Sequence, residues 1–539
     1  MKNFLITILV VSSFTLQAQE WMDASFGTNG IVTTNFPLNG LDEIQKLLTQ
    51  PDGKIIAIGN TRNATNFYDI GIARYLENGT LDPSFGTAGV DGITILDIQN
   101  EQNTVTDAFL QSDGKFVVLS SLKYANNTTD IVLTRFLSNG TVDTSFGTNG
   151  STIFGINTNP EDNEAGYGIL KLADDRILVV GTYEEDTATT PVYTLLTVFT
   201  TNGSVDVTFG TNGYLTFNIG NDNYSYADKA VQLNDGKIVF CGTYTSNVTN
   251  DDNAFVAKIN LDGSLDTTFA NNGVFTLDLN TALSLYSYDS AVNLAVSTDG
   301  KIGVVGFTAT DTYYDYLFFV LQANGTLDPT FSINGYHVWD HNGDANTLFS
   351  IASQEDGKWL VSGDYFSQNG ADTEGKFYVS RLNADGNFDA TFGVNGAITF
   401  DINATYLYTQ SSTMAIDSQG RIILGGFWYN NSSLDFAVAR LLTPELLEET
   451  IFFNEKHANL QLINPINKNI IIFNTSNNNE RMNVMIYNSL GNLVYSKENI
   501  FLISNEVTIP FDAYSKGVYY IQIQAIKQQK KQTYKILKI

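Results

Sequence analysis

The hydrophobic and polar positions of this chain repeat as four short apolar runs in every sixty or so residues. In the first unit, a run at 44–50 alternates loosely, and a Pro-Asp-Gly turn at 51–53 separates it from a second run at 54–60. A third run at 69–76 alternates clearly, and a fourth follows at 89–97. Alternation with a period of two, and Asp-Gly between two apolar runs, predict antiparallel strands joined by tight turns. No segment has the pattern of a long amphipathic helix.

Variants of one motif, LDPSFGTAG at 81–89, occur seven times. The spacings between their phenylalanines are 59, 61, 63, 60, 62 and 61 residues. Repeats of this length with four short strands each predict an all-β fold, a seven-bladed β-propeller. We expect each phenylalanine to be a structural anchor, buried between neighbouring units. The anchors are Phe26, Phe85, Phe146, Phe209, Phe269, Phe331 and Phe392.

Each motif carries an Asp two residues before a Ser or Thr, such as Asp82 and Ser84. This spacing predicts an Asx-turn, in which the carboxylate accepts the backbone N–H two residues on. The motif ends in a glycine, here Gly89, for which we expect a positive φ. A ring of calcium ligands is the alternative for the aspartates, but one Asp per unit cannot converge on one ion.

The first and last strands predict how the ring closes. The seventh unit stops after its third strand, near Leu442, whereas 30–36 form a fourth strand that lacks a unit of its own. We expect this N-terminal strand to complete the last blade, because closure removes two exposed sheet edges. The propeller is therefore assigned to 19–442.

The two ends of the chain have other roles. Residues 1–18 have one Lys, an apolar run and a small-residue site, which predicts a cleaved secretory signal peptide. Residues 443–451 form an acidic linker, and 452–539 contain short alternating strands typical of a small C-terminal β-sandwich domain. No later segment is apolar and long enough to span a membrane.

The net charge limits the classes of partner that the chain can bind, and the chain has a single cysteine. The chain has 29 Lys and Arg against 57 Asp and Glu, and from Phe452 onward the counts are 10 and 5. The rest therefore carries 19 basic and 52 acidic residues, a balance of −33. Such an acidic body disfavours nucleic acid and anionic membrane surfaces as partners. The single cysteine, Cys241, lies in an apolar run, and we expect it to be buried and inert.

The repeats resemble the delta-60 repeat family, whose units read roughly DGKILVAG, FALARLNPDG and LDTSFGTGG. The matching segments here are PDGKIIAIGN, IARYLENG and LDPSFGTAG, and the resemblance covers about Trp21 to Leu442. It implies a β-propeller and no particular reaction, because the family is defined by its repeat. Two units depart from the pattern, with Val198 and Val320 in place of the basic residue on the third strand.

The C-terminal segment resembles the type IX secretion (Por) sorting domain of Bacteroidetes. The matching residues are Asn464-Pro465, the run from Ile486 to Gly491, Gly517-Val518-Tyr519 and the terminal KILKI at 535–539. The resemblance implies a Gram-negative host and recognition by the type IX secretion machinery. It also implies passage through the periplasm to the outer cell surface or the medium.

Residues that would carry catalysis or bind a metal are few. His337 and His341 lie near two aspartates, but positions four apart on a strand are about 13 Å apart, too far for one metal. Ser353 to Trp359 matches the sialidase Asp-box SxDxGxxW only imperfectly. An enzyme should present acid, base and cation on loops of one face, and the sequence shows no such set. We therefore expect no catalytic residue, no metal, no cofactor and no enzymatic activity.

Strand parity predicts where a ligand binds. The turns between first and second strands and the Phe motifs fall on one face of the propeller, and both recur in similar form. The loops between second and third strands fall on the other face and differ in every unit, which is typical of binding loops on a rigid scaffold. Their aromatic residues suit the rings of a glycan or the side chains of a protein partner. The candidates are Tyr68, Tyr124, Tyr313, Tyr314, Tyr365, Trp428 and Tyr429.

Three functions remain open at this stage. The first is a secreted, non-catalytic propeller that binds an extracellular glycan or protein. The second is a glycoside hydrolase or lyase with its site at the channel mouth. The third is a purely structural surface or adhesion component.

Overall fold

The structure is a computed structural model, and it forms two compact units, Met1–Leu441 and Leu442–Ile539, which are described separately. The described residues are 21–37, 40–65, 67–86, 92–156, 162–185, 191–219, 224–248, 251–279, 288–309, 314–340, 346–369, 372–402, 408–430, 433–443, 460–462, 469–474, 481–488, 492–501, 506–511, 514, 517–525 and 531–538. The predicted signal peptide, most of the predicted linker, and Gly89, Tyr313 and His341 lie outside them.

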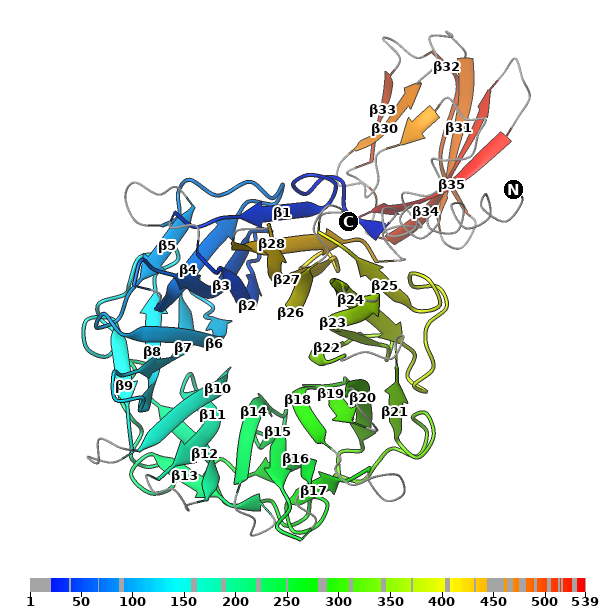
Figure 1. Cartoon of the computed structure of the whole chain (residues 1–539). Helices are drawn as coiled ribbons and strands as arrows, with labels where there is room; N and C mark the ends of the chain where they lie inside the picture. Colours follow the sequence, from blue (N-terminus) through cyan, green and yellow to red (C-terminus); the bar gives the residue numbers. More distant parts are fainter. Residues whose placement is uncertain are drawn as a thin grey trace, which may run out of the picture. The chain divides into compact units, whose positions relative to one another are not determined.

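Within its described residues, unit 1 consists of five four-stranded sheets and one eight-stranded sheet, arranged about a common axis (Figure 1). The eight-stranded sheet has two four-stranded halves, which a single parallel pair, Val192 and Tyr224, joins. The all-β class predicted from the sequence is confirmed. The strands are β1 (Ile31–Thr34), β2 (Glu43–Thr49), β3 (Ile55–Arg62), β4 (Tyr68–Tyr75), β5 (Ile93–Leu96), β6 (Gln102–Leu110), β7 (Phe116–Lys123), β8 (Thr129–Phe136), β9 (Ser151–Phe154), β10 (Asn163–Lys171), β11 (Ile177–Glu184), β12 (Val192–Phe199), β13 (Tyr214–Phe217), β14 (Tyr224–Gln232), β15 (Ile238–Thr245), β16 (Asp252–Ile259), β17 (Val274–Leu277), β18 (Asp289–Val296), β19 (Ile302–Ala309), β20 (Tyr314–Leu321), β21 (Tyr336–Trp339), β22 (Leu348–Ser353), β23 (Trp359–Asn369), β24 (Asp372–Leu382), β25 (Ala397–Phe400), β26 (Thr409–Ile416), β27 (Ile422–Tyr429) and β28 (Leu434–Leu441).

Each four-stranded set runs outward from the axis in the order first, second, third and fourth strand, as β2, β3, β4 and β5 do (Figure 1). The second and third strands are almost wholly buried, because neighbouring sheets cover both of their faces. One apolar cluster, for example, joins Ile58 and Ile72 to Val118 and Phe136 of the next set. Face-to-face packing of this kind explains the continuous apolar runs of the second strands.

The first strands alternate only loosely because each contains a β-bulge. In β2, the register with β3 shifts between Ile44 and Lys46, and β6, β10, β14, β18, β22 and β26 shift at the corresponding place. Gly59 of β3 lies opposite the bulge, and a Cβ there would come 1.9 Å from the carbonyl oxygen of Glu43. Gly59 is therefore required by the close approach of the bulged backbone in this set, whereas β7 has Ser120 at the corresponding position.

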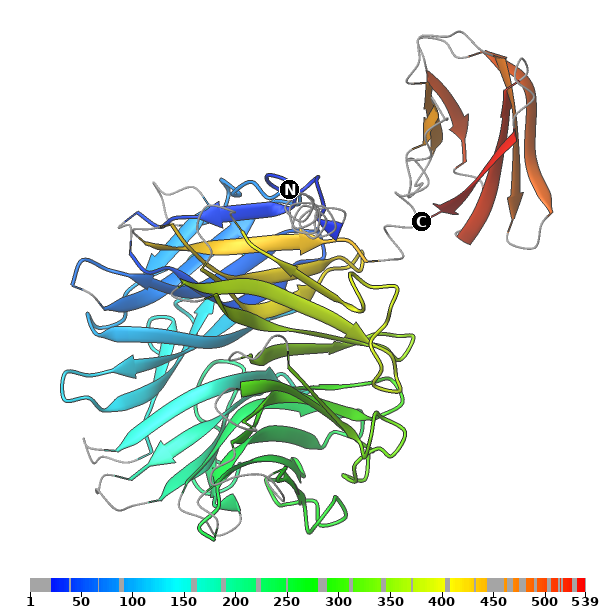
Figure 2. The ribbon, with the colours of Figure 1, turned by 45° about the vertical axis from the view of Figure 1, so that its right-hand side comes forward.

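The N-terminal strand belongs to the same sheet as the last strands of unit 1. β1 pairs antiparallel with β28, in the register Ile31 with Ala439 through Thr34 with Phe436. The ring of Phe36 packs edge-on against that of Phe436, with centroids 4.8 Å apart. The two ends of unit 1 therefore meet in one sheet, in the order β1, β28, β27 and β26 (Figure 2).

Unit 2 has two sheets over its described residues, one of three strands and one of four. One apolar core contains residues of both sheets, such as Ile470 and Ile509 from the first and Val484 and Ile521 from the second. The strands are β29 (Leu460–Leu462), β30 (Asn469–Asn474), β31 (Arg481–Asn488), β32 (Leu493–Phe501), β33 (Glu506–Pro510), β34 (Gly517–Ala525) and β35 (Lys531–Lys538).

Candidate binding face

Unit 1 has two unlike faces, and hydrogen bonds between successive sets show that equivalent ends of the sets lie together. We call the face with the first-to-second turns and the Phe motifs the turn face. There, the N–H of Gly86 donates to the carbonyl of Asn139 in the next set, 2.9 Å away. We call the opposite face, with the second-to-third loops and the crossovers to the next first strand, the loop face. Parallel bridges such as Asp252 with Tyr288 join neighbouring sets on that side.

The motif of the turn face forms the predicted Asx-turn. In the first set, the N–H of Ser84 donates to Oδ1 of Asp82 at 3.0 Å, and the other motifs repeat this bond. The phenylalanines are all buried, and a Cβ on Gly140 of the next set would come within 2.5–2.7 Å of the ring of Phe85. The motif therefore locks one set against the next. In the first set, Gly92, with φ +84°, donates to the Phe85 carbonyl as motif-end glycines do elsewhere.

The basic residue of the third strand pairs with the motif aspartate. Arg135 donates from Nε to Asp143 at 2.8 Å and from Nη1 to the carbonyl of Thr201 in the next set at 2.9 Å. Its guanidinium lies 4.7 Å from the ring centroid of Phe146. A second cation, Lys115 of the first-to-second turn, reaches the same carboxylate at 3.1 Å. Burial opposes ionisation of Asp143, but these cations and Ser145 hold its pKa below the usual range.

In the two sets that lack the basic residue of the third strand, the motif aspartate is paired with a single cation. Val198 replaces the third-strand basic residue in one set, where Asp206 is paired with Arg176 at 2.9 Å. Val320 replaces it in another, where Asp328 is paired with Lys301 at 2.7 Å. Every motif aspartate thus keeps at least one cation, which a buried carboxylate needs.

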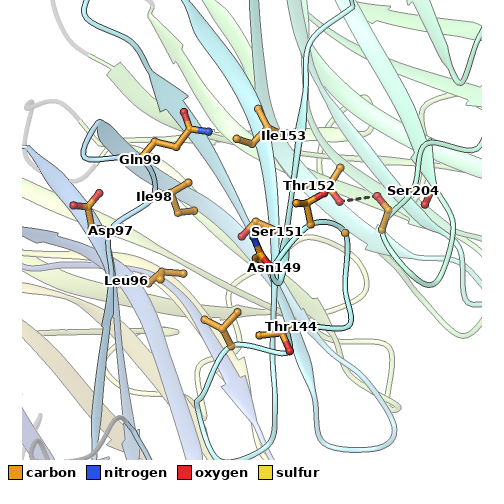
Figure 3. Close-up of a pocket in the computed structure, with 14 residues that line it drawn as sticks. Leu96, Asp97, Ile98, Gln99, Thr144, Asn149, Ser151, Thr152, Ile153 and Ser204 are labelled. Atoms are coloured by element: carbon orange, nitrogen blue, oxygen red, sulfur yellow. Dashed lines mark hydrogen bonds between the residues drawn. The ribbon is translucent and has the colours of Figure 1, made fainter.

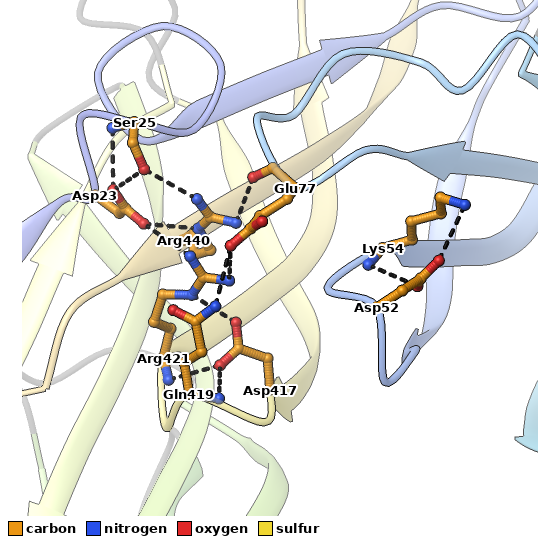
Figure 4. Close-up of polar contacts among 9 residues, drawn as sticks. All are labelled: Asp23, Ser25, Asp52, Lys54, Glu77, Asp417, Gln419, Arg421 and Arg440. Carbon is orange, nitrogen blue, oxygen red and sulfur yellow. Dashed lines mark hydrogen bonds and ion pairs between the residues drawn. The ribbon is translucent and has the colours of Figure 1, made fainter. Parts of the chain in front are cut away.

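Residues from both ends of unit 1 build the same arrangement where the ring closes (Figure 4). Arg440 donates from Nε to Asp23 at 2.8 Å, from Nη2 to Ser25 at 3.2 Å and from Nη1 to the carbonyl of Glu77 at 2.6 Å. Arg421 lies 3.3 Å from the Glu77 carboxylate and 3.7 Å from that of Asp23. The N-terminal motif is therefore held by β28 on one side and by the following set on the other.

Removal of both cations from Asp143 should cost more than the two single losses together. We expect Arg135→Val to lower the free energy of unfolding by about 1–2 kcal/mol, because Lys115 remains. Adding Lys115→Met leaves a buried carboxylate without a cation, at a cost of roughly 3–5 kcal/mol in all. Urea unfolding at neutral pH measures each step.

The set with Val198 provides a natural control for the removal of both cations from Asp143. There, Arg176 is the one Lys or Arg of the described residues that pairs with Asp206, so Arg176→Met alone should destabilise about as much as the double variant. Strictly additive losses in the set with Arg135 and Lys115, or a negligible loss for Arg176→Met, would contradict this account.

On the loop face, the structure separates the candidates predicted from the sequence. Tyr314 and Tyr429 are exposed, and Trp428 is half-buried. Tyr68 is half-buried, with the Arg62 guanidinium 5.9 Å from its ring centroid. Tyr124 is half-buried, and its hydroxyl donates to Asp130 at 2.6 Å.

Tyr365 is a correction, since only 7% of it is exposed. The sequence analysis assigned Tyr365 to a loop between the second and third strands, but β23 extends to Asn369 and β24 begins at Asp372. Tyr365 therefore lies within a long hairpin and belongs to the apolar core cluster that contains Tyr316 and Tyr378. Its ring is not available to a ligand.

Other exposed aromatic residues of the loop face were missed by sequence reasoning. Phe67, Tyr224, Tyr288 and Tyr408 are 36–44% exposed. Three of them stand where a crossover enters a first strand, a region outside the loops that the prediction considered. Within the described part of unit 1, every exposed large aromatic residue lies on the loop face, whereas the turn face exposes aliphatic residues such as Val394. An inventory of the crossovers as well as the loops would have found them.

Charge also differs between the faces. Among residues whose side chains the structure describes, the loop face has 19 Asp and Glu against three Lys and Arg, a balance of −16, and the turn face has 19 against 13, a balance of −6. The acidic residues of the loop face are Asp42, Glu43, Asp69, Asp97, Glu101, Asp130, Asp162, Glu164, Glu184, Glu185, Asp251, Asp252, Asp278, Asp289, Asp315, Asp340, Asp364, Asp401 and Asp435.

Several loop-face carboxylates resist ionisation. Burial raises the pKa of Asp42, Asp69 and Asp289 to about 6. Burial raises that of Glu164 and Asp364 to about 7. All five accept hydrogen bonds from neutral donors, as Asp42 does from the N–H of Phe36 at 2.9 Å. They brace the strand ends, and their neighbours supply little positive charge.

The axis of unit 1 is lined by a compensated charge cluster. Asp107 of β6, only 1% exposed, lies 2.9 Å from Lys46 of β2 and 2.5 Å from Lys229 of β14. It also accepts the N–H of Ile169 in β10 at 3.1 Å. Burial opposes its ionisation, but both lysines hold its pKa below the usual range. This carboxylate ties four first strands together, which is a structural role.

A pocket of about 780 Å³ opens between sets at the perimeter (Figure 3). Leu96, Ile98 and Ile153 form its apolar lining, and Asp97 and Gln99 contribute polar groups. None of the ligand-binding candidates from the sequence lines it. It is a groove between the outer strands β5 and β9.

The remaining reactive residues have structural surroundings. His337 Nδ1 lies 2.9 Å from the carbonyl oxygen of Gly386, and its ring packs against Trp339 and Phe388. Cys241 is buried, and burial raises the pKa of its thiol well above the usual value. No group of three or more His, Cys, Asp or Glu among the described residues is arranged to hold a metal ion.

Comparison with protein families identifies both parts of the chain. The family described as "Domain of unknown function (DUF5122) beta-propeller" matches residues 50–85, 111–146, 233–269 and 354–392. The "Secretion system C-terminal sorting domain" matches residues 464–538. The chain carries DUF5122 β-propeller repeats and a type IX secretion sorting domain. Each DUF5122 match begins at the turn into a second strand and ends at a motif phenylalanine, and the sets with Val198 and Val320 are not among them.

The sorting domain indicates secretion or an outer-surface location for these DUF5122 repeats, and recognition by the secretion machinery. No helix in the described part of the chain has the length and hydropathy to cross a membrane.

Solved structures resemble the chain only distantly. PorZ, a surface component of the type IX secretion system of Porphyromonas gingivalis, shows 11% identity over 93% of this chain and 59% of its own, with a TM-score of 0.37. An α-L-arabinofuranosidase of Fusarium graminearum shows 11% identity over 62% of this chain and 92% of its own, with a TM-score of 0.39. The chain spans 59% of the PorZ length, and likeness at these scores carries no argument about a ligand. No relative is found among curated proteins.

Proposed function

We propose that this protein is an exported, non-catalytic binding protein whose loop face holds an extracellular glycan or protein. The observation that carries the proposal is the confinement of exposed aromatic residues to that face. Aromatic rings contribute much contact area at little entropic cost, and they bind both sugars and protein side chains. The repeated basic residues of the turn face, in contrast, have a structural role, since Arg135 pairs with Asp143 in its own set and donates to Thr201 in the next.

We also propose that the repeats form a seven-bladed propeller. The seven motif copies support this count, as does the single parallel pair between Val192 and Tyr224 that joins the halves of the eight-stranded sheet. Similar isolated bridges, such as Leu41 with Leu434, connect other successive sets. A crystal structure of unit 1 with any other number of blades would overturn the count.

The absence of catalysis is part of the proposal. The carboxylates with raised pKa values resemble general acids in that respect alone, because they are bound to backbone and side-chain donors at strand ends. A hydrolase would release reducing sugar from the oligosaccharides that it binds. We expect the protein to bind without releasing any.

The test replaces Tyr224, Tyr288, Tyr314, Tyr408 and Tyr429 by Ala together. Each ring that stacks on a ligand contributes about 0.5–1.5 kcal/mol, so we expect retention on an array of oligosaccharides and extracellular proteins to fall at least about tenfold. The control replaces Val207, Leu261, Ile333 and Val394, exposed aliphatic residues of the turn face, by Ala. Equal retention of both variants, with unchanged melting temperatures, would move the site away from the loop face.

A further inference from the structure

The two faces hold their carboxylates in opposite ways. On the turn face, every motif aspartate has a Lys or Arg within 4 Å, as Asp143 has two. On the loop face, Asp42, Asp289 and Glu164 accept hydrogen bonds only from neutral groups, and no Lys or Arg of the described residues forms an ion pair with them. The same fold thus supplies a cation at every motif aspartate of one face, whereas ion pairs on the other face are few, such as that of Lys376 with Asp401.

The exposed rings stand beside this uncompensated charge. Tyr288 is bridged to Asp252, and its ring meets that of Tyr314 with centroids 6.4 Å apart. Tyr314 is in turn supported by Phe307 at 4.7 Å. Aromatic faces next to carboxylates form a favourable environment for ammonium and guanidinium groups, through cation–π attraction and charge together.

Aromatic rings can bind several classes of ligand, and the negative charge of the loop face favours some of these classes over others. A balance of −16 among the described side chains of the loop face repels acidic glycans and anionic lipids. A neutral glycan would contact the aromatic rings, but it would gain no attraction from the negative charge of the face. A basic peptide segment uses both, and the field of the face also accelerates its approach.

We propose that the loop face binds a Lys- and Arg-rich segment of a protein partner outside the cell, through its exposed tyrosines and its exposed carboxylates. This inference rests on the proposed binding function and names the class of its ligand.

The experiment measures binding of a fluorescent 12-residue peptide of alternating Arg and Lys with Gly and Ser to the mature full chain. The comparison peptide has citrulline and acetyl-lysine at the same positions, so its shape is kept and its charge is removed. We expect the basic peptide to bind at least about tenfold more tightly, with an advantage that shrinks as salt rises from 50 to 300 mM.

Matched charge variants locate the site. One variant carries Asp97→Asn, Glu184→Gln, Asp278→Asn and Asp340→Asn on the loop face, and the other carries Asp113→Asn, Asp262→Asn, Asp299→Asn and Asp385→Asn on the turn face. Both change the net charge equally, and all eight positions are exposed. We expect the loop-face variant to weaken binding of the basic peptide on the order of tenfold, and the turn-face variant to weaken it less than about twofold.

The outcomes distinguish this inference from the proposed function. Equal weakening by both variants, or no preference for the basic peptide, overturns the inference. If the protein then still binds a neutral oligosaccharide and loses it in the five-tyrosine variant, the proposed function stands without the basic ligand. If the five-tyrosine variant changes binding of neither probe, both fall.

Discussion

A chain that lacks residues 21–36 is expected to lose cooperative unfolding of unit 1 and to aggregate. The deletion removes the buried side chains of Met22, Phe26 and Phe36 and the whole of β1. Burial of these residues contributes roughly 10 kcal/mol, which is comparable with the total stability of a typical domain. It also exposes the edge of β28, an open template for pairing with other chains. Thermal unfolding followed by circular dichroism, together with light scattering, measures both effects.

A rescue experiment ties this loss to ring closure. A synthetic peptide of residues 21–36, added to the truncated chain, should restore a folded and monodisperse protein by pairing with β28 in the native register. A scrambled peptide of the same composition should not. If the truncated chain keeps its melting temperature without any peptide, the N-terminal strand does not hold the ring together.

Removal of residues 452–539 is expected to abolish export across the outer membrane and to leave unit 1 folded. The sorting domain that matches residues 464–538 would be lost. Unit 2 has an apolar core of its own, and the truncation keeps every residue of the apolar clusters of unit 1. In a host with a type IX system, we expect the truncated protein in the periplasm and less than about a tenth of the full-length amount outside, by immunoblotting of fractions.

A transplant supplies the matched control. Attachment of residues 452–539 to an unrelated periplasmic reporter should carry that reporter to the cell surface or the medium. Truncated protein that appears outside the cell in normal amount would show that unit 2 is not required for export. Binding of the probe peptide should be unchanged by the truncation if the loop face alone holds it.

Much of this protein could be predicted because its signals are local. The period of two, the Asp-Gly turns and the Asp of each motif act on residues a few positions apart, so the all-β class and the Asx-turns follow from the sequence. The repeat family and the sorting domain were predicted from short sequence motifs, and both are confirmed. Local chemistry decides such features, because the hydrogen bonds that form them close within one turn or hairpin.

The tertiary structure alone decided which side chains face solvent and which charges are compensated. Tyr365 looked like a loop residue, but a longer hairpin buries it, whereas Tyr288 and Tyr408 become exposed at crossovers. Arg135 reaches Asp143 in its own set and Thr201 in the next, a combination that depends on how the sets pack. Exposure and ion pairing depend on contacts between residues some sixty positions apart. The sequence pattern gives the residue types along the chain, but it does not give the side chains that surround each of them.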